Sequence, residues 1–190
     1  MRRWILLLFL TAASGPSGAQ TVEERLPVCF GCHGSAGVSA MENVPSLGGQ
    51  PADYLLIQLY QFREKARQSE IMNAMANGLS DDDLRTLSNT LSRLAPPPAG
   101  AGGALAEPEL TQARALVKKY RCGICHNADF SGHDQIPRLA GQREDYLLKA
   151  LNEYKSATRA GYDPAMNEVI QEVKATDIPL LVRYIGQFHP

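Results

Sequence analysis

All four cysteines of this 190-residue chain belong to two copies of one five-residue motif, Cys-x-x-Cys-His. The motif residues are Cys29, Cys32 and His33 in the first copy, and Cys122, Cys125 and His126 in the second. Two thiols three positions apart can each add to one vinyl group of a porphyrin, and the adjacent imidazole then faces the iron. The sequence therefore predicts two covalently attached haem c groups, held by the four cysteines, with His33 and His126 as iron ligands.

Two other chemistries could use the same residue types. A redox-active dithiol of the thioredoxin kind would need a βαβ context, and the sequence shows no such pattern. A zinc site could be built from Cys and His side chains, but a second ligand pair at the usual spacing is missing. Haem attachment is therefore the hypothesis that we carry forward, and no cysteine is left over for a disulfide.

The second axial ligand of each iron is expected among the methionines that follow the N-terminal segment: Met41, Met72, Met75 and Met166. Met72 lies 39 residues after His33, and Met166 lies 40 residues after His126. Met41 and Met75 have no methionine at the matching place in the other copy. The repetition predicts Met72 and Met166 as iron ligands, with Met75 as the alternative in the first copy.

This ligand set decides what chemistry the irons can do. Two strong ligands leave no open position for oxygen or peroxide. Thioether sulfur is a soft ligand that favours Fe(II) and raises the reduction potential. We therefore predict an electron-transfer protein and not an enzyme, with no catalytic residues. The remaining histidines, His133 and His189, are predicted to lie at the surface.

The two motifs are part of a longer repeat. Asp-Tyr-Leu-Leu at 53–56 returns unchanged at 145–148, and the Pro-x-Leu-x-Gly-Gln segment at 45–50 returns at 137–142. The offset stays between 92 and 94 residues along each copy, which indicates duplication of a whole folded unit. A Pro/Gly/Ala-rich stretch lies between the copies and is typical of a linker. The predicted organisation is a first domain at 20–95, a linker at 96–106 and a second domain at 107–190.

Apolar periodicity in both copies is typical of helices. Leu84, Leu87 and Leu91 form one apolar stripe, and Ser80 is the expected N-cap of that helix. Thr176 and Asp177 are expected to open the equivalent helix in the second copy. Further helices are expected at 51–66, 110–120 and 143–157, and a short one, which carries Pro27, at 21–28.

No stretch of the sequence alternates as a strand would, so the predicted class is all-α. The glycine-rich segment from 31 to 49 contributes few large apolar residues. Units of about 80 residues bury only about 60% of their unfolded surface and are marginal by themselves. We therefore expect each domain to be wrapped around one covalently bound haem, which completes its core.

The N-terminus has the pattern of a secretory signal peptide. Arg2 and Arg3 precede a short apolar run, and small residues lead to Ala19. The run is about half of the roughly 20 apolar residues that a membrane anchor needs. We predict a signal peptide at 1–19, cleaved after Ala19, and hence an exported protein, which the resemblance described below implies to be periplasmic.

Together these motifs give the chain a resemblance to the dihaem cytochromes c4, tandem class I c-type cytochromes of the bacterial periplasm, over residues 23–189. The resemblance implies that Pro45 and Pro137 offer backbone carbonyls to the Nδ1–H groups of the two motif histidines. It also implies two cytochrome c-like domains with the haem propionates turned toward a shared interface. Tyr54 and Tyr146 either line that interface or are ordinary aromatic residues of a helix face.

The resemblance also implies a function, a periplasmic electron shuttle from a quinol-oxidising complex to a terminal oxidase. The alternative is the cytochrome subunit of a periplasmic dehydrogenase complex. A dihaem peroxidase would need a displaceable iron ligand, which the two methionines argue against. The expected partners are redox proteins, with peripheral membrane association left open. The formal net charge of −1 gives no indication of a nucleic-acid partner.

Overall fold

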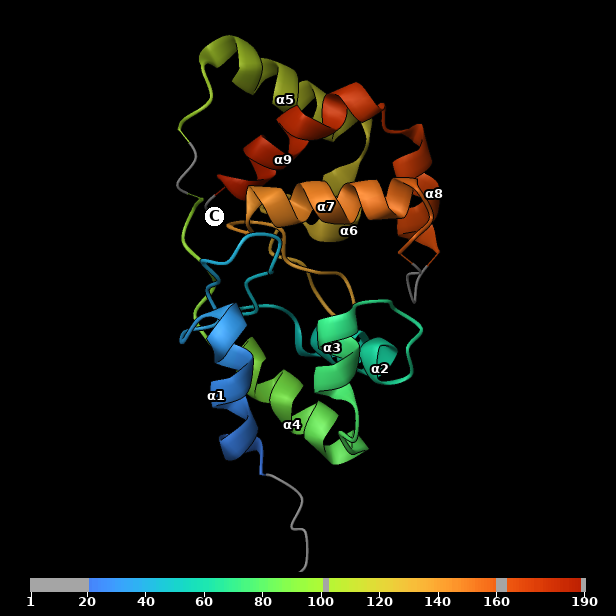
Figure 1. Cartoon of the computed structure of the whole chain (residues 1–190). Helices are drawn as coiled ribbons and strands as arrows, with labels where there is room; N and C mark the ends of the chain where they lie inside the picture. The colour runs from blue at the N-terminus through green and yellow to red at the C-terminus, as the bar shows by residue number, and fades with distance from the viewer. Residues whose placement is uncertain (1–20, 101–102, 160–163, 189–190) are drawn as a thin grey trace, which may run out of the picture.

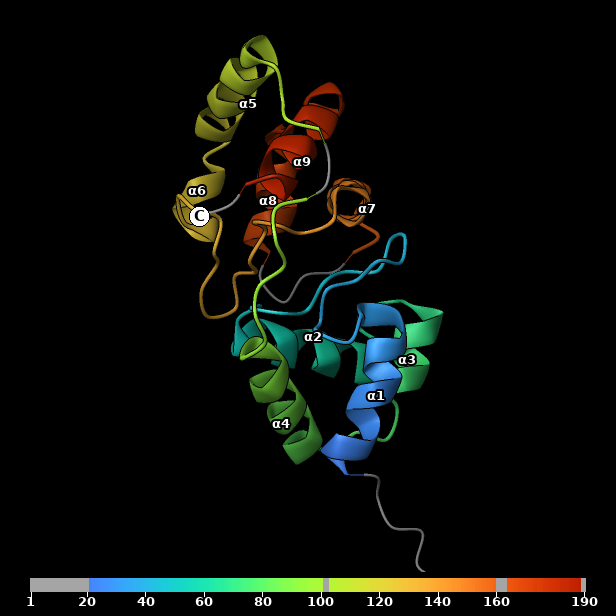
Figure 2. The same ribbon diagram turned by 90° about the vertical axis from the view of Figure 1, so that its left-hand side faces the viewer.

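The fold is described from a computed structural model, for residues 21–100, 103–159 and 164–188. Within these ranges the chain forms helices and loops, and the β-structure amounts to an isolated bridge between His133 and Ile136. The predicted all-α class is therefore confirmed. Figures 1 and 2 show the helices in two groups, α1 to α4 at one end and α5 to α9 at the other.

The first group, here called the N-terminal half, consists of α1 (Val22–His33), α2 (Ala52–Arg63), α3 (Glu70–Ala76) and α4 (Asp81–Ser92). Helix α2 packs against both α3 and α4, and α1 packs against α4. Their apolar faces meet in a small core of Phe62, Ala76, Leu79, Leu84 and Leu87.

The second group, the C-terminal half, has a larger core. Its elements are α5 (Glu107–Lys119), α6 (Cys122–His126), α7 (Glu144–Lys155), α8 (Ala165–Glu172), a 3-10 turn (Ala175–Asp177) and α9 (Ile178–Gly186). Helix α9 packs against α5 and α7, and α7 packs against α8. Phe130 is 1% exposed and fills the centre of this core, where its ring meets Tyr184 and Phe188 edge to face.

Helix α1 is longer than the sequence predicted. The expected helix at 21–28 continues through the first motif to His33, so Cys29 follows almost two turns of helix. Thr21 begins it with a capping box, in which Glu24 and Thr21 each accept a hydrogen bond from the other's backbone N–H. Pro27 lies inside the helix without ending it. The prediction of a short helix here was therefore wrong.

Two short helices that the periodicity did not indicate carry the predicted methionine ligands. Met72 lies on α3 and Met166 lies on α8. These helices have seven and eight residues, too few to repeat an apolar period clearly. Ser69 caps α3, and its hydroxyl accepts a hydrogen bond from the N–H of Met72.

The equivalent helices α4 and α9 begin differently. Ser80 is the N-cap of α4, as predicted, and forms a capping box with Asp83. Asp177 occupies the N-cap of α9, but its side chain makes no capping bond. Its carboxylate instead accepts a 2.7 Å hydrogen bond from the hydroxyl of Tyr120. The expectation that the two helices open alike was wrong, because Asp177 ties α9 to α5.

The Pro/Gly/Ala-rich segment runs along both halves. Gly49 has φ +65°, and a methyl group there would meet Pro96. Gly141 has φ +72°, and a methyl group there would meet the carbonyl oxygen of Pro97. Glycine is therefore required at these two equivalent turns both by backbone conformation and by close approach. The predicted domain boundaries themselves stay a prediction.

The α4 cap gives a prediction about stability. Replacing Ser80 with Ala removes the acceptor for the Asp83 N–H, so we expect the free energy of unfolding to fall by about 1 kcal/mol. Urea denaturation of the haem-loaded protein measures it. Ser92→Ala, near the other end of α4, is the control and should change stability by less than about 0.5 kcal/mol. Equal effects of the two variants would contradict the capping role.

The same cap should make stability depend on pH. Hydrogen bonds from Ser80 lower the pKa of Asp83. A carboxylate with a lowered pKa stabilises the fold above its unfolded pKa of about 4, and this contribution is lost as the pH falls through its folded value. We expect this acid loss to be smaller in Ser80→Ala than in the unmodified protein, as measured by unfolding at pH 3 to 6.

Candidate functional site

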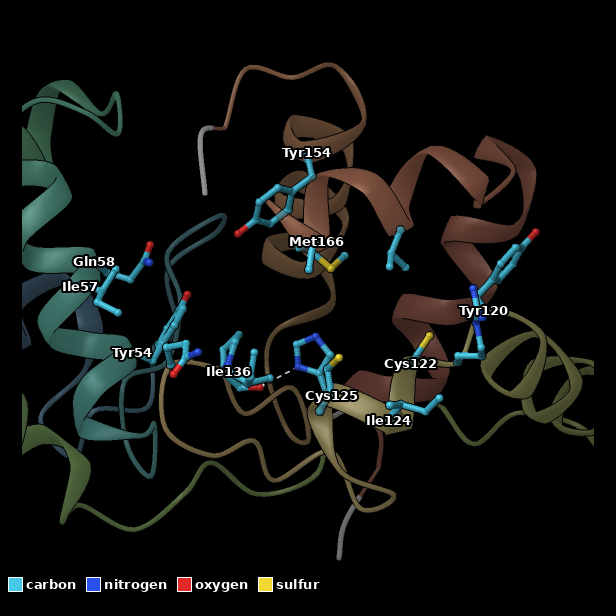
Figure 3. Close-up of a pocket in the computed structure, with 16 residues that line it drawn as sticks. Tyr54, Ile57, Gln58, Tyr120, Cys122, Ile124, Cys125, Ile136, Tyr154 and Met166 are labelled. Atoms are coloured by element: carbon cyan, nitrogen blue, oxygen red, sulfur yellow. Dashed lines mark hydrogen bonds between the residues drawn. The ribbon is translucent and has the colours of Figure 1, made fainter. Parts of the chain in front are cut away.

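The clearest site lies in the C-terminal half. A cavity of about 340 Å³ is lined by the motif residues Cys122, Cys125 and His126 together with Met166 of α8. Figure 3 shows this arrangement, with Tyr54 entering from α2 of the other half. A second cavity of about 110 Å³ shares Cys122, His126 and Met166. The structure thus brings all four predicted residues of the second copy around one space.

Local backbone geometry presents the second motif to this cavity. Arg121 has φ 57°, a left-handed conformation. It separates the end of α5 from α6, of which Arg121 is the N-cap. In the one-turn helix α6, Cys122 and Cys125 lie three residues apart and therefore share a face. In the N-terminal half, the motif forms the last turn of α1 instead.

Each motif histidine is held through its ring by a backbone carbonyl. Nδ1 of His33 lies 2.8 Å from the oxygen of Pro45, and Nδ1 of His126 lies 2.9 Å from the oxygen of Pro137. The predicted role of both prolines is thereby confirmed. A carbonyl accepts, so Nδ1 carries the hydrogen and Nε2 is the nitrogen left to bind a metal.

Burial favours the form of these histidines that binds metals. It lowers the pKa of His33 and of His126, and the hydrogen bonds to the proline carbonyls only partly oppose this. A lowered pKa keeps the imidazole neutral at physiological pH. Both rings are therefore in the protonation state that an iron ligand needs.

The predicted residues of the first copy are less fully assembled. A cavity of about 80 Å³ is lined by Cys29, Met72 and Met75. Cys32 and His33 belong to the same helix α1 but do not line this space. Met72 packs against the core, whereas Met75 is 39% exposed. Both methionines face the cavity, so the choice between them stays a prediction.

The two alternative chemistries find little support in the geometry. Burial raises the pKa of the Cys29 and Cys122 thiols, whereas a redox-active dithiol needs a lowered one. None of the four cysteines is joined in a disulfide. A zinc site needs a cluster of ligands, and the part of the chain that the structure describes holds no group of three or more His, Cys, Asp or Glu side chains placed for a metal ion.

Two arginines, the buried Arg159 and the partly buried Arg67, form a crossed cluster with two tyrosines between the halves. Arg159 of the C-terminal half donates to the hydroxyl of Tyr54, at 3.4 Å, and Arg67 of the N-terminal half donates to the hydroxyl of Tyr146, at 3.3 Å. Arg159 also donates to Tyr146. The tyrosines therefore lie at the boundary between the halves, one of the two places that the sequence allowed.

Positive charge dominates this cluster. Arg159 is 5% exposed, and the acid paired with it, Glu153, is 3.7 Å away. Burial alone would raise the pKa of Tyr146, but the charges of Arg159 and Arg67 outweigh it and lower that pKa. Because Arg159 lines the 110 Å³ cavity beside His126 and Met166, the site suits a flat apolar group that carries carboxylates, as haem does.

The sequence analysis missed both arginines of this cluster. Arg67 and Arg159 are separated by 92 residues, as are Tyr54 and Tyr146, so the duplication itself was the signal that could have found them. His133 is confirmed as a surface residue, with a side chain that is 49% exposed. His189 lies outside the described residues.

Comparison with known proteins places the chain among dihaem cytochromes. It is 29% identical over 198 residues to cytochrome c4 of Pseudomonas aeruginosa, covering 97% of this chain and 96% of that one. It is 32% identical over 148 residues to cytochrome c4 of Thiocapsa roseopersicina, covering 72% and 73%. It is also 30% identical over 174 residues to a thiosulfate dehydrogenase electron acceptor of Thiomonas intermedia, covering 86% and 80%.

Solved structures agree with these relatives. Reduced recombinant cytochrome c4 from Pseudomonas stutzeri superposes with a TM-score of 0.73 at 28% identity, over 90% of this chain and all of that one. The thiosulfate dehydrogenase TsdBA of Marichromatium purpuratum gives a TM-score of 0.70 at 27% identity, over 83% of this chain and 36% of that one. No family model matches the sequence.

The buried cluster gives a prediction about the interface. Replacing Arg159 with Met removes the donor to the Tyr54 hydroxyl and one of the two donors to the buried Tyr146 hydroxyl, so we expect the free energy of unfolding to fall by about 1–3 kcal/mol. Thermal denaturation of the haem-loaded protein measures the loss. The control is Arg183→Met, which removes an ion pair to Glu109 between partly exposed side chains and should cost less than about 1 kcal/mol. Similar losses would rule out the special role of Arg159.

Proposed function

The chain belongs to the cytochrome c4 family, and we propose that its six motif residues, together with Met72 and Met166, hold two haems in His/Met ligation for one-electron transfer. The cysteines form the thioethers, His33 and His126 bind one side of each iron, and Met72 and Met166 bind the other. The observation that carries this proposal is the convergence of Cys122, Cys125, His126 and Met166 on one cavity. The first copy repeats the same residues at matching spacing.

Family membership settles the general activity. The chain is a dihaem electron carrier with two covalently attached haem c groups, and it is an electron-transfer protein, not an enzyme. When bound, each haem supplies an iron that gains or loses one electron. The contribution of the protein is to fix the ligands, to exclude water and to set the potential.

The residues of the chain are arranged so that the iron ligands move little when an iron gains or loses an electron. Pro45 and Pro137 hold the two imidazoles by hydrogen bonds of 2.8 and 2.9 Å, which fix the tautomer and the orientation of each ring. Met166 packs against the C-terminal core. Ligands that are held in place before and after transfer need little rearrangement, and fast transfer depends on this.

We further propose that the crossed cluster holds haem carboxylates at the boundary between the halves. Arg159 and Arg67 supply the positive charge, and Tyr54 and Tyr146 supply hydroxyl donors. A guanidinium binds a carboxylate with two parallel hydrogen bonds. Because each half contributes one arginine and one tyrosine, this cluster supports haems that face each other across the boundary.

We propose redox proteins as the partners. A relative at 30% identity is named as the electron acceptor of a thiosulfate dehydrogenase, which supports a role beside a dehydrogenase. The main proposal is still a shuttle between a quinol-oxidising complex and a terminal oxidase. Purification from the native host separates the two, because a dehydrogenase subunit co-purifies with a larger protein and a shuttle elutes alone.

The location is proposed to be the periplasm. The predicted signal peptide at 1–19 lies outside the described residues. Among the residues that the structure describes, no helix has the length and apolarity needed to cross a membrane. Terminal sequencing of the exported protein should find Gln20 as its first residue, and peripheral membrane association is tested by salt extraction of membranes.

The whole proposal is tested by mass and by redox titration. The intact exported protein should carry the added mass of two haem groups, and the visible spectrum should show two low-spin centres that titrate with one electron each. Reduced protein should bind carbon monoxide poorly at neutral pH, because both axial positions are filled. Bare thiols, or ready carbon monoxide binding at either iron, would refute the ligation.

Substitution of the methionines gives a direct prediction. Met166→Ala should lower the potential of one haem and remove about half of the methionine–iron charge-transfer absorption at the far-red edge of the spectrum, because a soft ligand is lost. Met72→Ala should remove the other half, and Met75→Ala should leave the absorption unchanged. If Met75→Ala has the effect instead, Met75 is the ligand in the N-terminal half.

A further inference from the structure

Two glutamines make crossed contacts between the halves. The side chain of Gln50, in the N-terminal half, donates from Nε2 to the carbonyl oxygen of Arg138 at 2.8 Å and accepts at Oε1 from the N–H of Arg138 at 3.1 Å. The side chain of Gln142, in the C-terminal half, forms the same pair with Ser46, at 2.9 and 2.8 Å. Four buried residues are thus joined across the boundary in two equivalent pairs.

The peptide groups that the glutamines bind are the ones that hold the motif histidines. The N–H of Arg138 and the C=O of Pro137 belong to one peptide unit, and this C=O accepts from Nδ1 of His126. In the same way, the N–H of Ser46 shares its peptide unit with the C=O of Pro45, which accepts from His33. A continuous chain of hydrogen bonds therefore runs from each glutamine to the iron-binding histidine of the opposite half.

We propose that Gln50 and Gln142 are positioning residues that tune the axial histidine of the other half, so that each half sets part of the potential of its partner's haem. This inference rests on the proposed ligation by His33 and His126. It goes beyond that ligation because it assigns to each half an influence on the potential of the haem in the other half.

The physical basis is polarisation along the hydrogen-bond chain. When Oε1 of Gln50 accepts from the N–H of Arg138, electron density shifts toward the carbonyl oxygen of Pro137. That oxygen becomes a better acceptor for Nδ1–H of His126, and the imidazole becomes a stronger electron donor. A stronger donor stabilises the oxidised iron, so each glutamine lowers the potential of the opposite haem.

The turns that carry the glutamines are built alike. Gln50 closes a turn in which its N–H donates to the carbonyl of Leu47, and Gln142 does the same with Leu139. The residue before each glutamine is a glycine with positive φ, +65° at Gly49 and +72° at Gly141. This backbone conformation directs both side chains across the boundary, and Gln50 and Gln142 are only 4% and 3% exposed.

The test compares two substitutions of one residue in the haem-loaded protein. Gln50→Leu removes both hydrogen bonds, and the potential of the C-terminal haem should rise, by a three- to tenfold change in its ratio of reduced to oxidised form at a fixed ambient potential. Gln50→Glu keeps an acceptor oxygen in either protonation state, so that potential should stay unchanged or fall. NMR of partly oxidised samples follows each haem separately.

The effect should also appear at the opposite histidine and in the mirrored variant. In the reduced protein, Gln50→Leu should move the Nδ1–H resonance of His126 and leave that of His33 in place. Gln142→Leu should do the reverse and raise the potential of the N-terminal haem. Gln61→Leu is the matched control, because Gln61 is also buried in the N-terminal half, at 6% exposure, and its side chain bonds to Gln58 within α2.

Three results would overturn the inference. These are equal shifts of both haems, a shift confined to the haem of the half that was mutated, or shifts of the same sign in Gln50→Leu and Gln50→Glu. The last would indicate only a disturbed interface. A failure of the proposed ligation can be told apart from a failure of this inference. In that case the unmodified protein itself would lack a low-spin spectrum and the Nδ1–H resonances of His33 and His126.

Discussion

Much of this structure depends on one interaction, the hydrogen bond from a motif histidine to a proline carbonyl. An iron ligand has to present one particular ring nitrogen in a fixed direction. A free imidazole exchanges between two tautomers and rotates, so it meets neither requirement. By accepting from Nδ1, Pro45 and Pro137 select the tautomer and fix the plane of each ring. The long loops between the motifs and helices α2 and α7 serve to bring these carbonyls back to the histidines, and the same loops then form the boundary between the halves.

The two halves are related by duplication but are not equal in the structure. The C-terminal half has the larger apolar core and a cavity of about 340 Å³ that gathers all four of its proposed haem residues. The N-terminal half has a smaller core and a cavity of about 80 Å³ that gathers only Cys29 and the two methionines. Different surroundings desolvate two otherwise similar irons to different degrees, and this is a physical source of unequal potentials.

Much of the fold and of the site could be predicted from the sequence, because the duplication places each motif and most of the helix patterns in the chain twice. The Cys-x-x-Cys-His motifs specify a chemistry by residue type and spacing, and the leucine stripe of α4 specifies a helix by period. The full length of α1 could not be predicted, since Pro27 normally interrupts a helix and the Thr21 capping box that offsets it is a weak signal. The role of Asp177 could not be predicted either, because its partner Tyr120 is distant in sequence. The exact ligands stay a prediction.

The crossed glutamines recognise only the main chain of the partner half, and this has an evolutionary consequence. Ser46 and Arg138 are equivalent residues that share neither size nor charge, yet both receive the same pair of hydrogen bonds. Because the contact does not involve their side chains, the residues at positions 46 and 138 can change in evolution while the hydrogen bonds to the glutamines are kept. The glutamines themselves are not free to change in this way. If one half were replaced by that of a distant homologue, the new half would need a glutamine at the position of Gln50 or Gln142 to keep the contact.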